Sequence, residues 1–244
     1  MKDYELYSEL KIPKSSYIIL RLDGRSFHTL ADKINLEKPY DKNFLNLMID
    51  VSEDILKEFS PSFIYTFSDE INILLKEIPF NQRLEKIDSI VASFTSSSFT
   101  LNYNKYFNKE LYKPIAFDCR VILLNRDEIL DYFKWRQDEA WINCINSHGI
   151  SYLKSKFSPK KANEKIKGLK SSDIHEMLFK DGINLNNVDN WKKRGVALYK
   201  RKKKIEGFNK KENKNTTSYR NYIYKDFDLP IFSDNFFNKF IQSD

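Results

Sequence analysis

The sequence predicts an α+β fold whose first half follows the ferredoxin-like order βαββαβ, with additional C-terminal helices and a basic β-hairpin arm after it. Three observations support this prediction. Short apolar, β-prone runs alternate with two longer segments whose apolar residues recur at helical spacing. The acidic pair Asp69-Glu70 separates two of these runs, as the turn of a hairpin would. The C-terminal part is rich in lysine and asparagine, which suits an exposed arm.

The individual elements follow from these runs. We expect strands at 16–22, 62–67, 71–77 and 115–124, and helices at 41–58 and 82–104. A long helix is expected at 126–153, with shorter helices at 160–167 and 171–180. Two strand-like runs, 195–200 and 218–224, enclose a basic and polar loop, interpreted as the mobile tip of the arm. We expect residues 1–125 to form a core and residues 126–244 to pack on it as one integrated unit.

The composition excludes an intrinsically disordered chain, because 41% of the 244 residues are hydrophobic and 15% are aromatic. The net charge of +7 suits a polyanionic partner. Cys119 and Cys144 lack metal-ligand spacing and are expected to be buried free thiols. We expect a cytoplasmic protein, because no apolar run reaches the roughly 18 residues of a membrane span and the first residues show no signal-peptide pattern.

Two acidic residues lie at the ends of predicted strands. Asp23 follows the first strand, and Asp69 lies in the turn after the second. In a βαββαβ sheet the first two strands point the same way, so these two positions share one edge and the acids should converge. Clustered carboxylates repel one another unless a cation neutralises them, so the pair predicts a Mg²⁺ site.

Each motif also has a purely structural interpretation. Asp23-Gly24 is a common turn dipeptide, and Ser68-Asp69-Glu70 could be a solvated hairpin tip. In the functional interpretation, Asp23 and the Gly24 carbonyl ligate the metal, while the following N–H groups bind phosphate oxygens. The coincidence of the two acids at one edge favours the functional interpretation.

Three further features have two interpretations each. Arg83 and Lys86, three residues apart at a helix start, form either a solvated face or a phosphate clamp. His28 is either a structural hydrogen-bonding residue or a base or stacking partner. Residues 192–214 contain eleven Lys or Arg and only two Glu, and form either a solvated arm or a surface for a phosphate backbone.

Together, in this order, several segments resemble the tRNA-His guanylyltransferase family, in particular its Thg1-like branch of 3′–5′ polymerases. The resemblance covers nearly the whole chain, and its main segments are residues 21–28, 38–41, 67–70, 83–94, 117–121, 135–137, 176–184 and 191–201. It implies a polymerase-type palm that uses two Mg²⁺ ions. Asp23, the Gly24 carbonyl and Asp69 match the metal ligands, and Glu70 matches an adjacent acid important for activity, so that Asp23, Asp69 and Glu70 are the implied catalytic residues.

The resemblance also implies nucleotide contacts. The matching positions are Asp23, Gly24, Arg25, Ser26, Phe27, His28, Lys38, Asp41, Ser68, Asp69, Arg83, Lys86 and Arg120. The implied substrates are ATP, GTP or other nucleoside triphosphates and tRNA, and the implied assembly is a dimer or tetramer. In the implied reaction, ATP adenylylates the 5′ end of tRNA, and the 3′-hydroxyl of an incoming nucleotide then displaces AMP.

One departure from the family bears on the choice of tRNA. Eukaryotic members carry His-Ile-Asn-Asn-Leu-Tyr-Asn where residues 141–147 read Trp-Ile-Asn-Cys-Ile-Asn-Ser. Loss of the His and Tyr favours template-dependent repair of 5′-truncated tRNA over selection of tRNA-His by its anticodon, with G−1 addition to tRNA-His as the alternative. A nucleotide cyclase-like palm enzyme and a non-catalytic tRNA-binding protein are the competing hypotheses.

Overall fold

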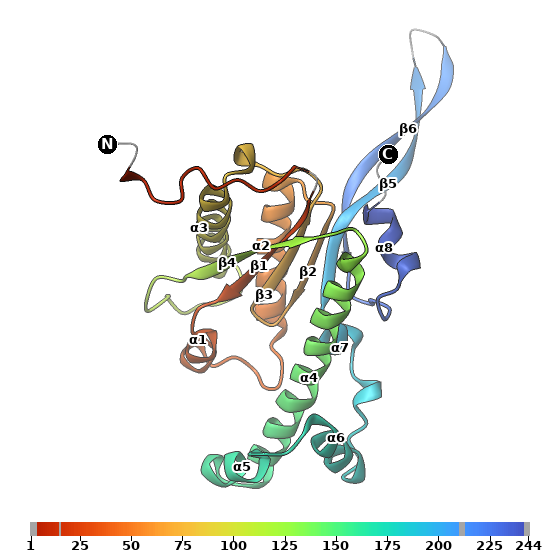
Figure 1. Ribbon diagram of the computed structural model, residues 1–244. Coiled ribbons are helices and arrows are strands. Elements are labelled where there is room, and N and C mark those ends of the chain that lie inside the picture. Colours follow the sequence, from red (N-terminus) through yellow and green to blue (C-terminus); the bar gives the residue numbers. More distant parts are fainter. Residues whose placement is uncertain (1–3, 15, 210–212, 242–244) are drawn as a thin grey trace.

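A computed structural model of the protein describes residues 4–14, 16–209 and 213–241 (Figure 1). Its sheet has six strands in the order β4-β1-β3-β2-β5-β6, and every neighbouring pair is antiparallel. The strands are β1 (Tyr17–Gly24), β2 (Phe63–Phe67), β3 (Glu70–Leu75), β4 (Phe117–Leu124), β5 (Val196–Asn209) and β6 (Lys214–Asp226). The first four strands and the helices between them confirm the predicted βαββαβ core.

The strand register brings the two distant acids to one edge of the sheet. Asp23 lies opposite Glu70 of β3 on one side and opposite Asp118 of β4 on the other. Asp69 precedes Glu70 in the turn that joins β2 to β3. The end of β1 and the β2–β3 turn therefore share an edge, as the topology predicts.

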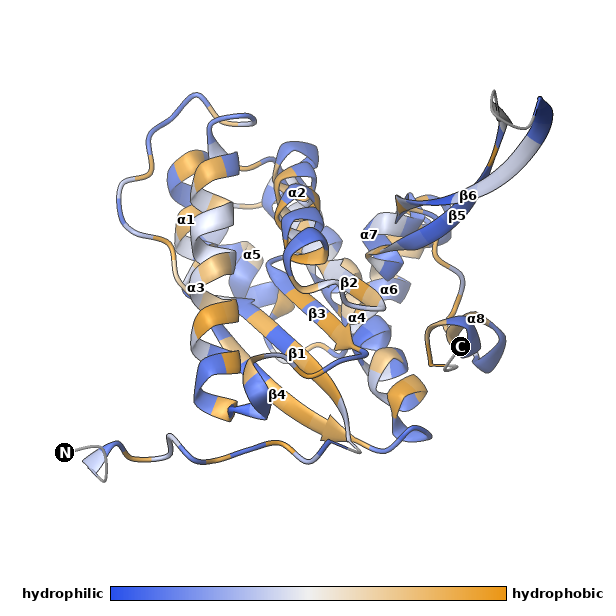
Figure 2. Ribbon diagram, turned by 90° about the horizontal axis from the view of Figure 1, so that it is seen from above, coloured by the Kyte–Doolittle hydropathy of each residue, from blue (hydrophilic) through white to orange (hydrophobic). Residues whose placement is uncertain are grey.

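Two helices cover one face of the sheet. Because successive side chains of a strand point to opposite faces, every second residue of β1 points toward these helices. Ile18, Leu20 and Leu22 of β1 belong to the core cluster packed under α2 (Lys42–Phe59) and α3 (Leu84–Tyr103). Figure 2 shows these helices beside the sheet, with hydrophobic residues along the strands. Ile19 points the other way, into a second cluster with α4 (Glu128–Lys156) and α8 (Asp234–Ile241).

The lower half of α4 carries a small helical unit. Helices α5 (Pro159–Ile166) and α6 (Ser171–Lys180) pack on α4, and Ile145, Ile174, Leu178 and Leu185 form a separate apolar cluster there. Helix α7 (Asn190–Arg194) then leads into β5 through Gly195, whose φ is 71°. An added Cβ at Gly195 would lie 2.7 Å from the Thr66 carbonyl oxygen, so this entry requires glycine.

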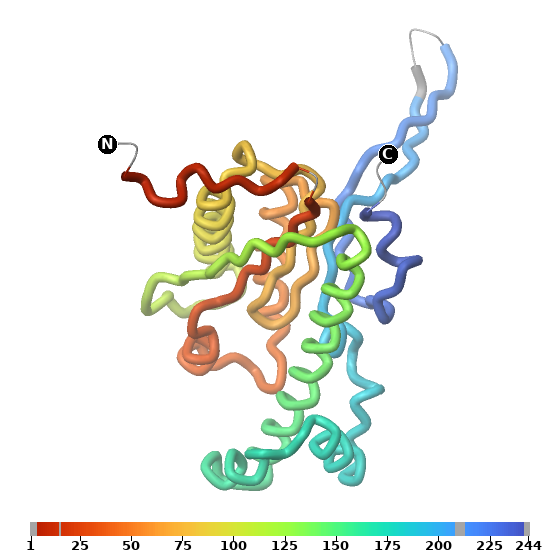
Figure 3. Tube along the Cα trace, in the orientation of Figure 1, coloured from red at the N-terminus to blue at the C-terminus, as the bar shows by residue number. Residues whose placement is uncertain are grey.

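The arm differs from its predicted form. Residues 201–204, expected in a loop, lie inside β5. Residues 197–209 of β5 pair with the whole of β6 as a ribbon that projects beyond the core (Figure 3). Backbone hydrogen bonds hold this ribbon together, so it needs no alternation of apolar and polar side chains. The tip predicted to be mobile includes residues 210–212, which lie outside the described residues.

Three helices were not predicted. Helix α1 (Phe27–Ile34) follows the Asp23-Gly24 motif directly, and α7 and α8 lie in the C-terminal region. Each has ten residues or fewer, which makes a helical period hard to detect. Among the described residues, Cys144 is buried as expected but Cys119 is only partly buried, and both are free thiols. No helix in the described part of the chain is long and apolar enough to cross a membrane.

Candidate active site

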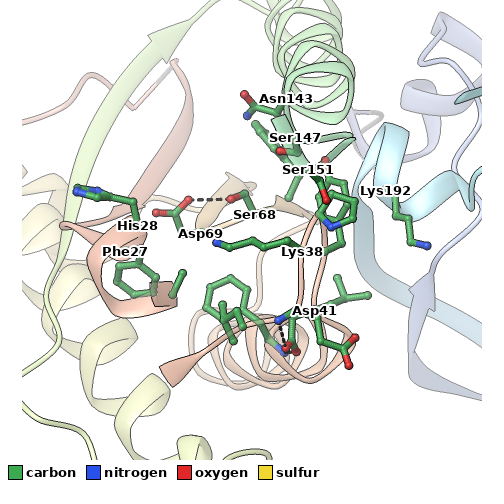
Figure 4. Close-up of a pocket in the computed structure, with 18 of the residues that line it drawn as sticks. Phe27, His28, Lys38, Asp41, Ser68, Asp69, Asn143, Ser147, Ser151 and Lys192 are labelled. Atoms are coloured by element: carbon green, nitrogen blue, oxygen red, sulfur yellow. Dashed lines mark hydrogen bonds between the residues drawn. The ribbon is translucent and has the colours of Figure 1, made fainter. Parts of the chain in front are cut away.

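An acidic rim forms where β1 and the β2–β3 hairpin end. Phe67 pairs with Glu70, so Ser68 and Asp69 make a two-residue turn, and Ser68 has the positive φ of 51° that such a turn requires. The Ser68 hydroxyl donates a hydrogen bond to Asp69 Oδ1 at 3.0 Å (Figure 4). This tight turn holds the Asp69 carboxylate at the edge that Asp23 also occupies.

The two carboxylates of the rim repel each other. Burial and the charge of Asp23 raise the pKa of Asp69 to about 6. Neither residue forms a salt bridge with any described residue. The rim therefore carries negative charge that the described protein side chains leave unneutralised.

The donor set of the rim suits Mg²⁺ bound together with a nucleotide. The described residues contain no group of three or more His, Cys, Asp or Glu side chains able to hold a metal. Two carboxylates and the main-chain oxygen of Gly24 would instead supply part of the coordination, and phosphate and water oxygens the rest. Mg²⁺ commonly binds in this way, through one or two carboxylates plus substrate phosphates. The residues present therefore fit the predicted metal.

A cavity of about 690 Å³ opens beside the rim, a size that suits a nucleotide. The structure brings eight of the predicted contact residues to its wall. They are Gly24, Ser26, Phe27, His28, Lys38, Asp41, Ser68 and Asp69. Figure 4 shows Lys38 extending into the cavity on the side of Asp69.

The ring of the core residue Phe27 explains why position 24 requires glycine. A Cβ at Gly24 would lie 2.3 Å from the Phe27 ring, which no side chain could tolerate without displacing the ring. Phe27 is 5% exposed and packs against Phe99 and Phe117 at ring-centroid distances of 5.3 and 5.0 Å. Phe27 therefore anchors α1 in the core, and only part of its ring borders the cavity.

Asp41 has a structural role that the sequence analysis did not predict. It is the N-cap residue of α2, where Oδ1 accepts a hydrogen bond from the Phe44 N–H at 2.9 Å and Oδ2 accepts one from the Glu37 N–H at 3.0 Å. Asp41 thus lines the cavity while both of its oxygens hold the loop that carries Lys38.

Five predicted contact residues do not line the cavity, and one of them, Asp23, lies at its rim. Arg83 and Lys86 lie at the start of α3, where Arg83 bridges to Lys11 near the beginning of β1, at the sheet edge opposite Asp69. Arg120 lies on the outer strand β4 with its Nε 3.5 Å from Asp118 Oδ1. Arg25 is exposed, and its N–H donates to the Ala116 carbonyl. The structure therefore does not bring Arg83 and Lys86 to the Asp23–Asp69 rim of the same chain.

Glu70 is tied to α4 by a buried ion pair. Arg136 donates from Nε to Glu70 Oε1 at 2.8 Å and from Nη2 to Oε2 at 2.7 Å, and the two residues are 6% and 8% exposed. Asn72 Nδ2 also donates to Glu70 Oε1, and Tyr132 donates to Asn72 Oδ1. Arg136 therefore neutralises the implied third acid, and this network docks α4 beside the rim.

Sequence reasoning missed the second wall of the cavity. Asn143, Ser147, Ser151 and Lys154 of α4 line it opposite the rim, together with Trp191 and Lys192 (Figure 4). The four α4 residues are spaced four, four and three positions apart, which places them on one helix face. This polar stripe was the signal that could have identified them.

Comparison with known proteins shows the family of the chain. Two family models match the chain, "tRNAHis guanylyltransferase" over residues 1–125 and "Thg1 C terminal domain" over residues 127–227. A probable tRNA(His) guanylyltransferase of Dictyostelium discoideum is 36% identical over 196 residues, covering 76% of this chain and 75% of the relative. The tRNA(His) guanylyltransferase of Schizosaccharomyces pombe is 35% identical over 193 residues, covering 76% of this chain and 73% of the relative.

Solved structures with the same fold include members from yeast and bacteria. The tRNA(His) guanylyltransferase of Saccharomyces cerevisiae has a TM-score of 0.72 and 28% identity, covering 80% of this chain and 90% of that one. A bacterial Thg1-like protein in complex with ATP has a TM-score of 0.76 and 26% identity, covering 99% and 97%. By its matched family models, its sequence relatives and its fold, the chain belongs to the tRNA(His) guanylyltransferase family.

Proposed function

We propose that this protein is a nucleotidyltransferase that adds nucleotides in the 3′–5′ direction to the 5′ end of tRNA. The observation that carries the proposal is the meeting of Asp23 and Asp69 at the rim of a nucleotide-sized cavity, in a chain of this family. Solved Thg1-like proteins in complex with ATP and GTP support nucleoside triphosphates as its substrates.

The proposed reaction has two steps. A 5′-phosphate oxygen of the tRNA first attacks the α-phosphorus of ATP, so that pyrophosphate leaves and the 5′ end becomes adenylylated. The 3′-hydroxyl of the incoming nucleotide then attacks the 5′-phosphorus of the tRNA, and AMP leaves. Two Mg²⁺ ions, held by Asp23, the Gly24 carbonyl and Asp69, would lower the pKa of the attacking oxygen and neutralise phosphate charge.

The chain's own residues contribute position and charge. Lys38 brings positive charge to the cavity wall, which favours the polyphosphate, whereas the Lys192 amine lies 3.1 Å from Asp189. The Asp41 cap fixes the Lys38 loop, and the Glu70–Arg136 pair fixes α4 opposite the rim. Glu70 would therefore act through the position of the rim, as a positioning residue.

Template-dependent repair is the favoured form of the reaction. Trp141 stands where the eukaryotic motif has His, and its ring packs against His175 of α6 at a centroid distance of 5.8 Å. Trp141 is thus part of the small helical unit and does not line the cavity. We propose that 5′-truncated tRNA is extended according to its own 3′ strand, with G−1 addition to tRNA-His as the alternative.

One assay tests the function. Truncated tRNA is incubated with Mg²⁺, ATP and labelled GTP, using the wild type, Asp69→Ala and the exposed control Asp131→Ala. Extension by the wild type and the control alone supports the proposal. A free cyclic nucleotide would instead identify a cyclase, and RNA binding without extension would identify a non-catalytic tRNA-binding protein. Unchanged turnover by Asp69→Ala would refute the metal assignment.

We also propose a cytoplasmic homo-oligomer, a dimer or tetramer. Support comes from the half-exposed Trp135 of α4, whose ring lies against Arg21 of β1, and from the tRNA substrate of the family. Light scattering after size exclusion, with Trp135→Ala for comparison, measures the assembly directly. A monomeric wild type at micromolar concentration would contradict it.

A further inference from the structure

A second basic surface lies at the lower end of α4, far from the arm. Seven lysines fall within residues 154–170, against the single acid Glu164. We call them the α5 lysine cluster: Lys154, Lys156, Lys160, Lys161, Lys165, Lys167 and Lys170. Figure 1 shows α5 and the β5–β6 arm at opposite ends of the molecule. The cluster is therefore separate from the basic arm that the sequence indicated.

The charge of this cluster is almost wholly uncompensated. All seven lysines are exposed. Lys156 lies 3.8 Å from Asp181, and the other six form no salt bridge with any described residue. Lys161 and Lys165 lie over the Phe157 ring at 5.4 and 4.8 Å, which holds two of the charges in place. Such dense, one-sided charge repels itself and favours binding of a polyanion.

The cluster is continuous with the cavity. Lys154 belongs to both, and the stripe Asn143, Ser147 and Ser151 leads to it along α4 from the wall facing Asp69. Lys154 lies eleven positions after Asn143, which is about 16 Å along a helix. Ile166, the last residue of α5, approaches Gly149, so α5 lies against the C-terminal half of α4. A chain whose end sits at the rim would reach the cluster within a few nucleotides.

We propose that the α5 lysine cluster binds the phosphate backbone of the RNA stem next to the 5′ end that enters the cavity. The inference rests on the proposed function, because that function places an RNA 5′ end at the rim. The polar stripe on α4 would contact the terminal nucleotides, and the lysines the phosphates behind them. Phosphate contacts of this kind set the position of a nucleic acid without reading its sequence.

Salt-dependent binding tests the proposal without catalysis. Fluorescence anisotropy measures the affinity of a labelled minihelix, made of acceptor and T stems only, between about 50 and 200 mM salt. The test variant carries Lys154→Gln, Lys160→Gln and Lys167→Gln. The matched control carries Lys11→Gln, Lys14→Gln and Lys134→Gln, three exposed lysines outside the cavity wall and the cluster. A third variant replaces the test lysines by arginine.

We expect the magnitude of the slope of log affinity against log salt to be smaller by about 2.7 in the test variant, since each lost phosphate contact removes about 0.9. The control and arginine variants should keep the wild-type slope. An unchanged slope in the test variant, or an equal loss in the control, overturns the inference. If the wild type binds the minihelix but extends no RNA, the proposed function fails while this binding surface stands, so the two failures are distinguishable.

Discussion

Asp69 carries the chemistry of the rim at a cost to the stability of the metal-free protein. Its turn places it beside Asp23 and partly out of water, and its raised pKa reports the energy of that arrangement. Such sites commonly trade stability for function.

Asp69→Asn should therefore make the metal-free protein more stable while abolishing nucleotide addition. The substitution keeps the shape and removes one of two repelling charges, so the free energy of unfolding in EDTA at pH 8 should rise by about 1 to 3 kcal/mol. Urea denaturation measures it, and Mg²⁺ should then stabilise the wild type more than the variant. A variant less stable than the wild type in EDTA would contradict the repulsion.

His148 should contribute a pH-dependent loss of stability. It is half-buried on α4, where burial lowers the pKa of its imidazole below the ordinary value. As the pH falls below about 6.5, the unfolded chain binds a proton that the folded protein resists, so the free energy of unfolding decreases. His148→Phe keeps a ring against Tyr40 and removes this proton. Denaturation between pH 7.5 and 5.5 should show a smaller decrease for the variant, and parallel curves would refute the assignment.

Helix α4 is the element that completes the site, and two polar contacts fix it. Arg136 pairs with Glu70 of β3, and Gln137 donates to the Pro230 carbonyl and accepts from the Phe232 N–H. The adjacent residues of the Trp-Arg-Gln motif thus bind the sheet on one side and the C-terminal segment on the other. The position of the α4 wall relative to the rim depends on both.

Arg136→Met should destabilise the protein by about 3 to 5 kcal/mol, because it leaves the Glu70 carboxylate buried without its partner. The double variant Arg136→Met with Glu70→Leu should recover most of this loss, since two apolar side chains can replace a buried ion pair. Chemical denaturation of both single variants and the double variant forms the cycle. Additive losses in the double variant would show that the two residues do not act as a pair.

The arm is anchored at its base and basic along its length. Lys225 of β6 pairs with Glu53 of α2 at 2.6 Å, and Tyr199 donates to Asp226 at 2.7 Å. Beyond this base, Lys202, Lys203 and Lys204 are exposed. With the α5 lysine cluster, the molecule carries basic surfaces at both ends of the cavity-bearing core, so full tRNA would span more of the protein than an acceptor stem alone.

Side chains alternate between the two faces of the β5–β6 ribbon, so a test of RNA binding by the arm can separate the lysines of each face. Lys202 and Lys204 share one face of the ribbon and Lys203 lies on the other. If the face with Lys202 and Lys204 meets RNA, the double variant Lys202→Gln with Lys204→Gln should weaken binding of full tRNA and reduce the magnitude of the slope of log affinity against log salt by about 1.8. If the other face meets RNA, Lys203→Gln should instead reduce it by about 0.9. Anisotropy with full tRNA measures both. Wild-type slopes in both variants would exclude this part of the arm from the interface.

Local pattern and topology were sufficient for the core and for the meeting of Asp23 and Asp69. Apolar periodicity gave the four strands and two long helices of the core in their order, and a βαββαβ order allows the relevant strand ends only one shared edge. Short helices such as α1 and the extent of the ribbon were missed, because few residues carry a period and backbone pairing leaves little trace in polar side chains.

The sequence alone was enough to predict the fold, the family resemblance and the acidic rim. Each of these depends on spacing along the chain and on which strand ends a sheet can bring together. Only the tertiary structure decided which partners surround that rim. It paired Glu70 with Arg136, which lies 66 residues later in the sequence. It also placed Arg83 and Lys86 at the sheet edge opposite the rim, and the polar face of α4 on the far wall of the cavity. These outcomes depend on how helices dock on the sheet, and docking is determined by side-chain contacts between segments that no local period relates.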